Sequence, residues 1–61
     1  MIALRKVVIV DDEFWAIESL KDSVNWSQLG YEIAEVFTSA ERALLYLKEN
    51  PVDVALVDIM M

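Results

Sequence analysis

Neither cysteine nor histidine occurs in this chain of 61 residues. Their absence excludes disulfides, thiolate nucleophiles, Cys/His zinc sites and acid–base chemistry by imidazole. Glycine and proline occur once each, which leaves little room for long irregular loops. Carboxylates are therefore the side chains that remain for chemistry.

Basic residues are scarce: five Lys and Arg face eleven Asp and Glu, and the net charge is −6. This charge opposes binding to nucleic-acid phosphates and anionic membrane surfaces, so DNA binding is expected only through sequence outside this chain. No apolar run approaches the roughly 18 residues of a membrane span, and no secretory leader pattern is visible. We expect a cytoplasmic protein that contacts no membrane.

Apolar residues, by contrast, make up 57% of the chain. Two helices alone could not cover so much apolar surface. A domain of this length buries only about 60% of the surface that its unfolded chain exposes, so its stability alone is expected to be marginal. Something outside the chain is expected to help it fold.

Two short apolar runs end in acids. Residues 6–10 lead into Asp11, and residues 54–57, within a strand predicted at 52–58, lead into Asp58. Neither run alternates with polar residues, and this pattern is typical of strands that are buried on both faces of a parallel sheet.

A helix is predicted after the first of these strands. Asp12 and Glu13 lie where acids favour a helix N-terminus, so capping could be part of their role. Gly30 tolerates the left-handed conformation found just past helix ends, and residues 26–30 are predicted to form the helix exit. The apolar stripe of this helix consists of Phe14, Ile17, Leu20 and Val24.

A second helix is predicted further along the chain. Thr38 and Glu41 have the spacing of a capping box, in which Thr accepts from the backbone and Glu reaches back. Pro51 ends the helix because proline disfavours helical geometry in the residue before it. The apolar face consists of Ala40, Ala43, Leu44 and Leu47.

The strand expected at residues 31–37 carries Glu32 and Glu35, which suits the edge of a sheet. Strand, helix, strand, helix and strand predict an α/β fold with a parallel sheet and right-handed crossovers. With the first strand central, the helices fall on opposite faces and the strand order is second-first-third. This βαβαβ order is one half of a flavodoxin-like doubly wound parallel sheet.

Ligands of such sheets bind beyond the carboxyl ends of the strands at the switch point, where Asp11, Asp12 and Asp58 all map. A hard cation such as Mg²⁺ would offset their mutual repulsion, and a carboxylate beside it can attack phosphorus. The suggested chemistry is transfer of a phosphoryl group to an aspartate. Any one of these acids alone would more often be a solvated loop residue or a helix cap, so the hypothesis depends on all three together.

Other conspicuous residues have plainer interpretations. Glu13 fits a helix start better than a metal ligand. Trp15 and Trp26 fit packing or partner contact better than stacking on bases, because no basic residues accompany them. Met60 and Met61 fit apolar filler or a loop, with no thioether metal site in view.

Residues 7–13 and 52–61 resemble the two signature strands of response-regulator receiver domains, the phosphate-accepting modules of two-component signalling. The resemblance runs the length of the chain, and the pair of motifs at this separation is more specific than Asp-Asp-Glu alone. Residues 26–31 also resemble receivers that are fused to helix-turn-helix domains, which implies a DNA-binding output domain and a role in transcription regulation.

The resemblance implies that Asp58 accepts phosphate from the phosphohistidine of a sensor histidine kinase. It also implies that Mg²⁺ is held by the side chains of Asp12 and Asp58 and by the backbone carbonyl of Met60, with Asp11 acting through a water. In this role the chain is a signalling module and not an enzyme.

A receiver would continue beyond this sequence through two more strands and three more helices. Residues 1–61 are therefore expected to be the N-terminal half of the domain, a fragment with impaired or no activity. The other half would carry the family's Ser/Thr switch residue, its phosphoryl-contacting Lys and an aromatic residue that reports activation. The third strand then becomes an exposed apolar edge, and self-association is expected by edge pairing or by exchange of elements.

Two other functions stay open. A scaffold fragment or pseudo-receiver would assemble through its apolar edge without chemistry, and Mg²⁺ binding that depends on Asp58 would separate it from a phosphoacceptor. An aspartate-based phosphatase or related hydrolase can share an acidic strand end. It predicts an Asp-x-Asp motif, however, and Met60 occupies the second position.

Overall fold

The computed structural model describes residues 3–58 as an alternation of strands and helices. The elements are β1 (Arg5–Val10), α1 (Phe14–Ser23), β2 (Tyr31–Phe37), α2 (Ala40–Glu49) and β3 (Val54–Val57). This is the order that the sequence predicts. Neither helix within residues 3–58 could span a lipid bilayer.

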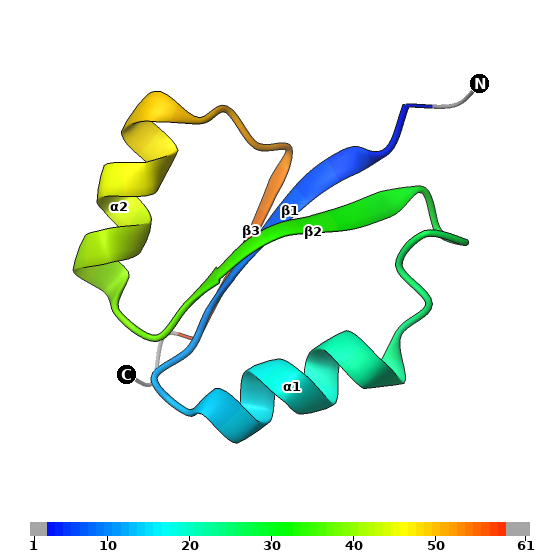
Figure 1. Ribbon diagram of the computed structural model, residues 1–61, viewed down its shortest axis with the longest axis horizontal. Coiled ribbons are helices and arrows are strands. Elements are labelled where there is room, and N and C mark those ends of the chain that lie inside the picture. The colour runs from blue at the N-terminus through cyan, green and yellow to red at the C-terminus, as the bar shows by residue number, and fades with distance from the viewer. Residues whose placement is uncertain (1–2, 59–61) are drawn as a thin grey trace.

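β1 is the central strand of a three-stranded parallel sheet with the order β2-β1-β3. The predicted α/β class and the half of a flavodoxin-like sheet are therefore confirmed. Figure 1 shows α1 and α2 on opposite sides of the sheet. β1 pairs with β3 in an unbroken register, whereas its register with β2 shifts between Val7 and Val8.

The buried core is built on both faces of β1, whose residues 7–10 are at most 2% exposed. Val7 and Ile9 pack with Ile17 of α1, and Val8 and Val10 pack with Ala43 of α2. Successive side chains of a strand point to opposite faces, so one uninterrupted apolar run serves both halves of the core.

α1 ends at Ser23, one residue before the predicted apolar stripe does, because the backbone of Val24 is extended. Phe14, the other end of that stripe, is 55% exposed. Of the predicted stripe, Ile17 is buried and Leu20 is half-buried, so the middle of the stripe is the part of α1 that packs on the sheet. Trp26 packs against the core on the α1 side, as predicted, whereas Trp15 is 82% exposed.

Gly30 closes a separate turn between α1 and β2. The N–H of Tyr31 donates to the carbonyl of Trp26 over 2.8 Å, and the N–H of Gly30 donates to that of Ser27 over 3.1 Å. This pair of bonds is the Schellman pattern, and it requires the positive φ of +89° at Gly30. The left-handed glycine is confirmed, but it ends this turn rather than α1.

The N-cap of α2 is Ser39, whose Oγ accepts from the N–H of Arg42 over 3.4 Å. The predicted capping box of Thr38 and Glu41 is therefore wrong by one residue. Ser and Thr are both good N-cap residues, so which of them caps α2 depends on the residue at which β2 ends. α2 ends just before Pro51, as predicted.

Leu44 is 61% exposed although it was assigned to the apolar face of α2. It borders a hollow of about 190 Å³ between α2 and the sheet, whose other lining residues include Val10 and Val57. Because this hollow separates them, Leu44 is not packed against Val57 of β3.

β3 is shorter at both ends than the strand predicted at 52–58. Just before it, Asp53 bonds to Lys6 of β1 with both its backbone and its side chain. Its N–H donates to the carbonyl of Lys6 over 2.9 Å, and its carboxylate accepts from the N–H of Lys6 over 2.7 Å. These bonds fix the start of β3.

The substitution Ile17→Ala is expected to lower the free energy of unfolding by about 2–5 kcal/mol, because Ile17 is 1% exposed and its truncation leaves a cavity under β1. Urea unfolding followed by circular dichroism measures this change. The matched control is Leu29→Ala, whose side chain is 63% exposed and whose loss should cost less than about 0.5 kcal/mol. Equal losses would contradict the assigned core.

The substitution Gly30→Ala is expected to destabilise the chain by about 1–2 kcal/mol through backbone strain. No atom lies within 4 Å of the position that a Cβ would occupy, so steric contact with neighbours does not contribute. A synthetic chain with D-alanine in place of Gly30 is the matched control, because that residue favours positive φ, and its stability should not fall. The same urea assay tests both chains, and an equal loss in both would argue against strain.

Candidate metal centre

The acids predicted at the sheet edge follow the ends of β1 and β3. The N–H of Asp11 donates to the carbonyl of Phe37 at the end of β2, over 3.0 Å. The N–H of Asp58 donates to the carbonyl of Val10 over 3.0 Å. These bonds extend the strand pairing to the point where each strand ends, so both acids leave the sheet at its carboxyl edge.

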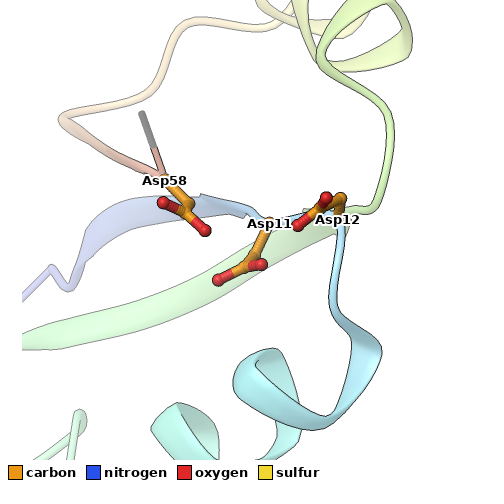
Figure 2. Close-up of side chains that lie close together, drawn as sticks. All are labelled: Asp11, Asp12 and Asp58. Atoms are coloured by element: carbon orange, nitrogen blue, oxygen red, sulfur yellow. The ribbon is translucent and has the colours of Figure 1, made fainter. Parts of the chain in front are cut away.

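The carboxylates of Asp11, Asp12 and Asp58 converge at this edge, as Figure 2 shows. One oxygen from each side chain lies within 4.8 Å of the other two. Asp11 and Asp58 are half-buried, and Asp12 is exposed. The structure thus brings together the three side chains that the sequence places at the switch point.

A hydrogen bond fixes the orientation of Asp11. Its Oδ1 accepts from the N–H of Glu13 over 2.9 Å, which closes a turn between β1 and α1. Glu13 itself is the N-cap residue of α1, makes no capping bond with its side chain and lies outside the acidic cluster. Glu13 is therefore a helix-start residue, as predicted, but its side chain makes no capping bond, and its own N–H donates to Asp11.

A cavity of about 340 Å³ lies beside the acids and gives them an apolar wall. The sequence did not predict this wall, because it depends on how α1 crosses the sheet. In the sequence, only Leu20 in the predicted helix stripe and the apolar run of β3 pointed to such a wall. The lining residues are Ile9, Val10, Asp11, Leu20, Leu56, Val57 and Asp58.

The charges at this edge favour a hard cation. Three carboxylates within 4.8 Å repel one another, and none of the residues that line the cavity is basic. Carboxylate oxygens are ligands that suit Mg²⁺, Ca²⁺ or Mn²⁺ rather than softer metals. The cluster could therefore hold a divalent ion, and Mg²⁺ fits its chemistry. Met60, the predicted carbonyl ligand, lies outside the described residues.

Comparison with known proteins assigns no family: no protein-family model, curated protein or solved structure matches the chain. The parallel sheet and the acidic cluster are compatible with a receiver domain without demonstrating one. What is established about this site comes from the fold and from the geometry of its three acids.

Mg²⁺ is expected to raise the free energy of unfolding, by about 2.7 kcal/mol at one hundred times its Kd, because it binds the folded cluster and not the unfolded chain. The substitution Asp12→Asn should remove most of this gain, while slightly stabilising the metal-free chain by relieving repulsion. Urea unfolding with Mg²⁺ or with a chelator measures both effects.

The matched control is Glu13→Gln, which removes the same charge one residue away and outside the cluster. It should leave the Mg²⁺-dependent gain intact. If both variants lost the same stabilisation, the response to Mg²⁺ would reflect general charge screening and not a site.

Proposed function

We propose that the chain is a phosphoacceptor module of the receiver type, in which Asp58 accepts a phosphoryl group from a phosphohistidine of a sensor histidine kinase. The observation that carries the proposal is the convergence of three carboxylates from the ends of β1 and β3. The sequence resemblance of residues 7–13 and 52–61 to receiver signature strands, which include these acids, also supports it.

Asp58 is the proposed acceptor because it follows β3 and also lines the cavity through which a phosphoryl donor would approach. One carboxylate oxygen attacks phosphorus and forms an acyl phosphate. The phosphorus–nitrogen bond of the phosphohistidine breaks, and its electron pair stays on the imidazole nitrogen. The group is transferred without net oxidation or reduction.

Asp11 and Asp12 are proposed as the remaining acidic ligands of Mg²⁺. The bond from the N–H of Glu13 preorganises Asp11, so that its carboxylate needs little reorientation to reach a cation or a bridging water. When bound, Mg²⁺ supplies charge neutralisation for the transferring group. Asp12 is exposed, which suits a ligand that must exchange with solvent.

The proposed setting follows from the same resemblance. A cytoplasmic histidine kinase supplies the phosphoryl group, and an output domain outside these 61 residues contacts DNA to regulate transcription. The chain carries a net charge of −6, so we assign it no contact with nucleic acid of its own. It accepts the group and is not proposed to act as an enzyme.

A second candidate is a pseudo-receiver or scaffold fragment that performs no chemistry. The observation that favours it is the outer edge of β3, which pairs with no other strand among residues 3–58. This role needs neither a cation nor Asp58. Dependence of phosphorylation on both would therefore exclude it.

Incubation with phosphoramidate and Mg²⁺ is expected to add one phosphoryl group to the chain, because this donor has the same phosphorus–nitrogen bond as phosphohistidine. Intact-mass spectrometry measures the addition, and hydroxylamine should remove it because an acyl phosphate is labile to this nucleophile. Asp58→Asn should abolish the addition. A chelator should abolish it as well, because the transferring group then lacks charge neutralisation.

Asp22→Asn is the matched control, since it makes the same substitution at an exposed position of α1 outside the cluster. It should accept phosphate as the native chain does. Circular dichroism of all three chains shows whether each is folded. Phosphorylation of a folded Asp58→Asn chain, or phosphorylation that persists without divalent cations, would overturn the proposal.

A further inference from the structure

The side chains of β3 do not by themselves determine its register against β1. β3 is Val-Ala-Leu-Val and pairs with residues 7–10 of β1, which are Val-Val-Ile-Val. Val54 packs on the α1 face of the sheet and Val57 lies on the α2 face, so both faces of β3 are apolar. A strand with one polar face is held in register by its alternation, whereas a slip of β3 would exchange one apolar contact for another.

Asp53, the residue before β3, is bonded to both backbone groups of Lys6. Its Oδ2 accepts from the N–H of Lys6 over 2.7 Å, and its own N–H donates to the carbonyl of Lys6 over 2.9 Å. A charged acceptor forms a shorter and stronger bond than a neutral carbonyl does. None of the four residues of β3 has a polar side chain, so none of them could make this pair of bonds in a slipped register.

We propose that Asp53 is a positioning residue of the acidic site. Its bonds to Lys6 set the register of β3. That register places the carboxylate of Asp58 beside those of Asp11 and Asp12. The proposal rests on the proposed function for what the site does, but the register itself can be tested without Mg²⁺ or a phosphoryl donor.

The position of Asp58 follows from the start of β3 because the strand is short and extended. Only the four residues of β3 separate Asp53 from Asp58, whose N–H donates to the carbonyl of Val10 over 3.0 Å. A slip by one residue would move Asp58 about 3.3 Å along β1 and turn its side chain to the opposite face. A slip by two residues would keep the face but move Asp58 about 6.6 Å. The oxygens of the three acids lie within 4.8 Å of one another, so either slip would remove Asp58 from the cluster.

Asp11 is held by other elements than β3. Its N–H donates to the carbonyl of Phe37 at the end of β2, and its carboxylate accepts from the N–H of Glu13. The bonds between Asp53 and Lys6 therefore position one side of the site only. Their loss should displace Asp58 while Asp11 keeps its place.

Hydrogen exchange of the metal-free chain, followed by NMR, tests the register directly. The Asp58 amide reports the pairing of β3 with β1, and the Asp11 amide, which bonds to Phe37, reports the pairing of β1 with β2. In Asp53→Ala, exchange at Asp58 is expected to rise about fivefold relative to exchange at Asp11, the effect of losing one hydrogen bond of ordinary strength. The Leu56 amide faces β1 together with that of Asp58 and should change with it. An equal rise at Asp11 and Asp58, or none at Asp58, overturns the proposal.

Two altered chains are the controls. Asp53→Asn keeps an oxygen that can accept from the N–H of Lys6, and it should restore most of the protection at Asp58. Asp22→Ala removes the same carboxylate from an exposed position of α1 and should leave the ratio of the exchange rates unchanged. Every sample contains sucrose, which favours the compact state and keeps the weakened chain folded, as circular dichroism can verify. Equal losses of protection in Asp53→Asn and Asp53→Ala would overturn the proposal, because the bond to Lys6 would then not be responsible.

Mg²⁺ titration of the same chains tests the consequence for the site. A residue that only stabilises the fold would leave the Mg²⁺ affinity of the folded chain unchanged, because each folded molecule would still hold the complete cluster. Asp53→Ala should instead raise the Kd about fivefold, while Asp53→Asn and Asp22→Ala should stay close to the native value. The NMR shifts of the Asp11 and Asp12 amides measure this Kd.

The two measurements separate this proposal from the proposed function. An unchanged Kd in folded Asp53→Ala overturns the positioning role of Asp53, provided that the native chain binds Mg²⁺. A native chain that binds no Mg²⁺ would contradict the proposed function instead. The exchange rates at Asp58 and Asp11 would then decide by themselves whether Asp53 sets the register of β3.

Discussion

The burial of β1 between two parallel neighbours is the constraint on which the rest of the molecule depends. Residues 7–10 supply side chains to both clusters of the core, with Ile17 closing one face and Ala43 the other. Each cluster is too small to stay buried without β1, which contributes residues to both. Loss of either helix would therefore expose one face of β1 and weaken the other half of the core, so the fold is expected to form as a single cooperative unit.

The same constraint explains where the charge lies. A strand buried on both faces cannot carry unpaired acids along its length, because each would lose its hydration without compensation. Acids can follow only where the chain leaves the sheet, as Asp11 does after β1. Parallel pairing then brings Asp58 to the same edge, since both strands end there. An antiparallel β3 would have sent the two carboxylates to opposite edges.

The sequence predicts the strands and their ends better than it predicts helix caps and helix packing. Apolar runs show where strands end, so the proximity of Asp11 and Asp58 was predictable from the sequence alone. The choice of Ser39 over Thr38 was not, because both residues cap well and the outcome depends on where β2 ends. The exposure of Leu44 and the apolar wall beside the acids were also beyond the sequence, since they depend on how each helix crosses the sheet.

β3 is the element through which the acidic site and the sheet influence each other. Among residues 3–58 it pairs with β1 alone, with Asp53 bonded to Lys6 at its start and the N–H of Asp58 bonded to Val10 at its end. Repulsion between Asp58 and Asp11 acts to separate β3 from β1 at that second point. A cation held between the two carboxylates would attract both of them, and so would draw the ends of β1 and β3 together. Occupancy of the site should therefore be transmitted directly to the pairing of β3 with β1.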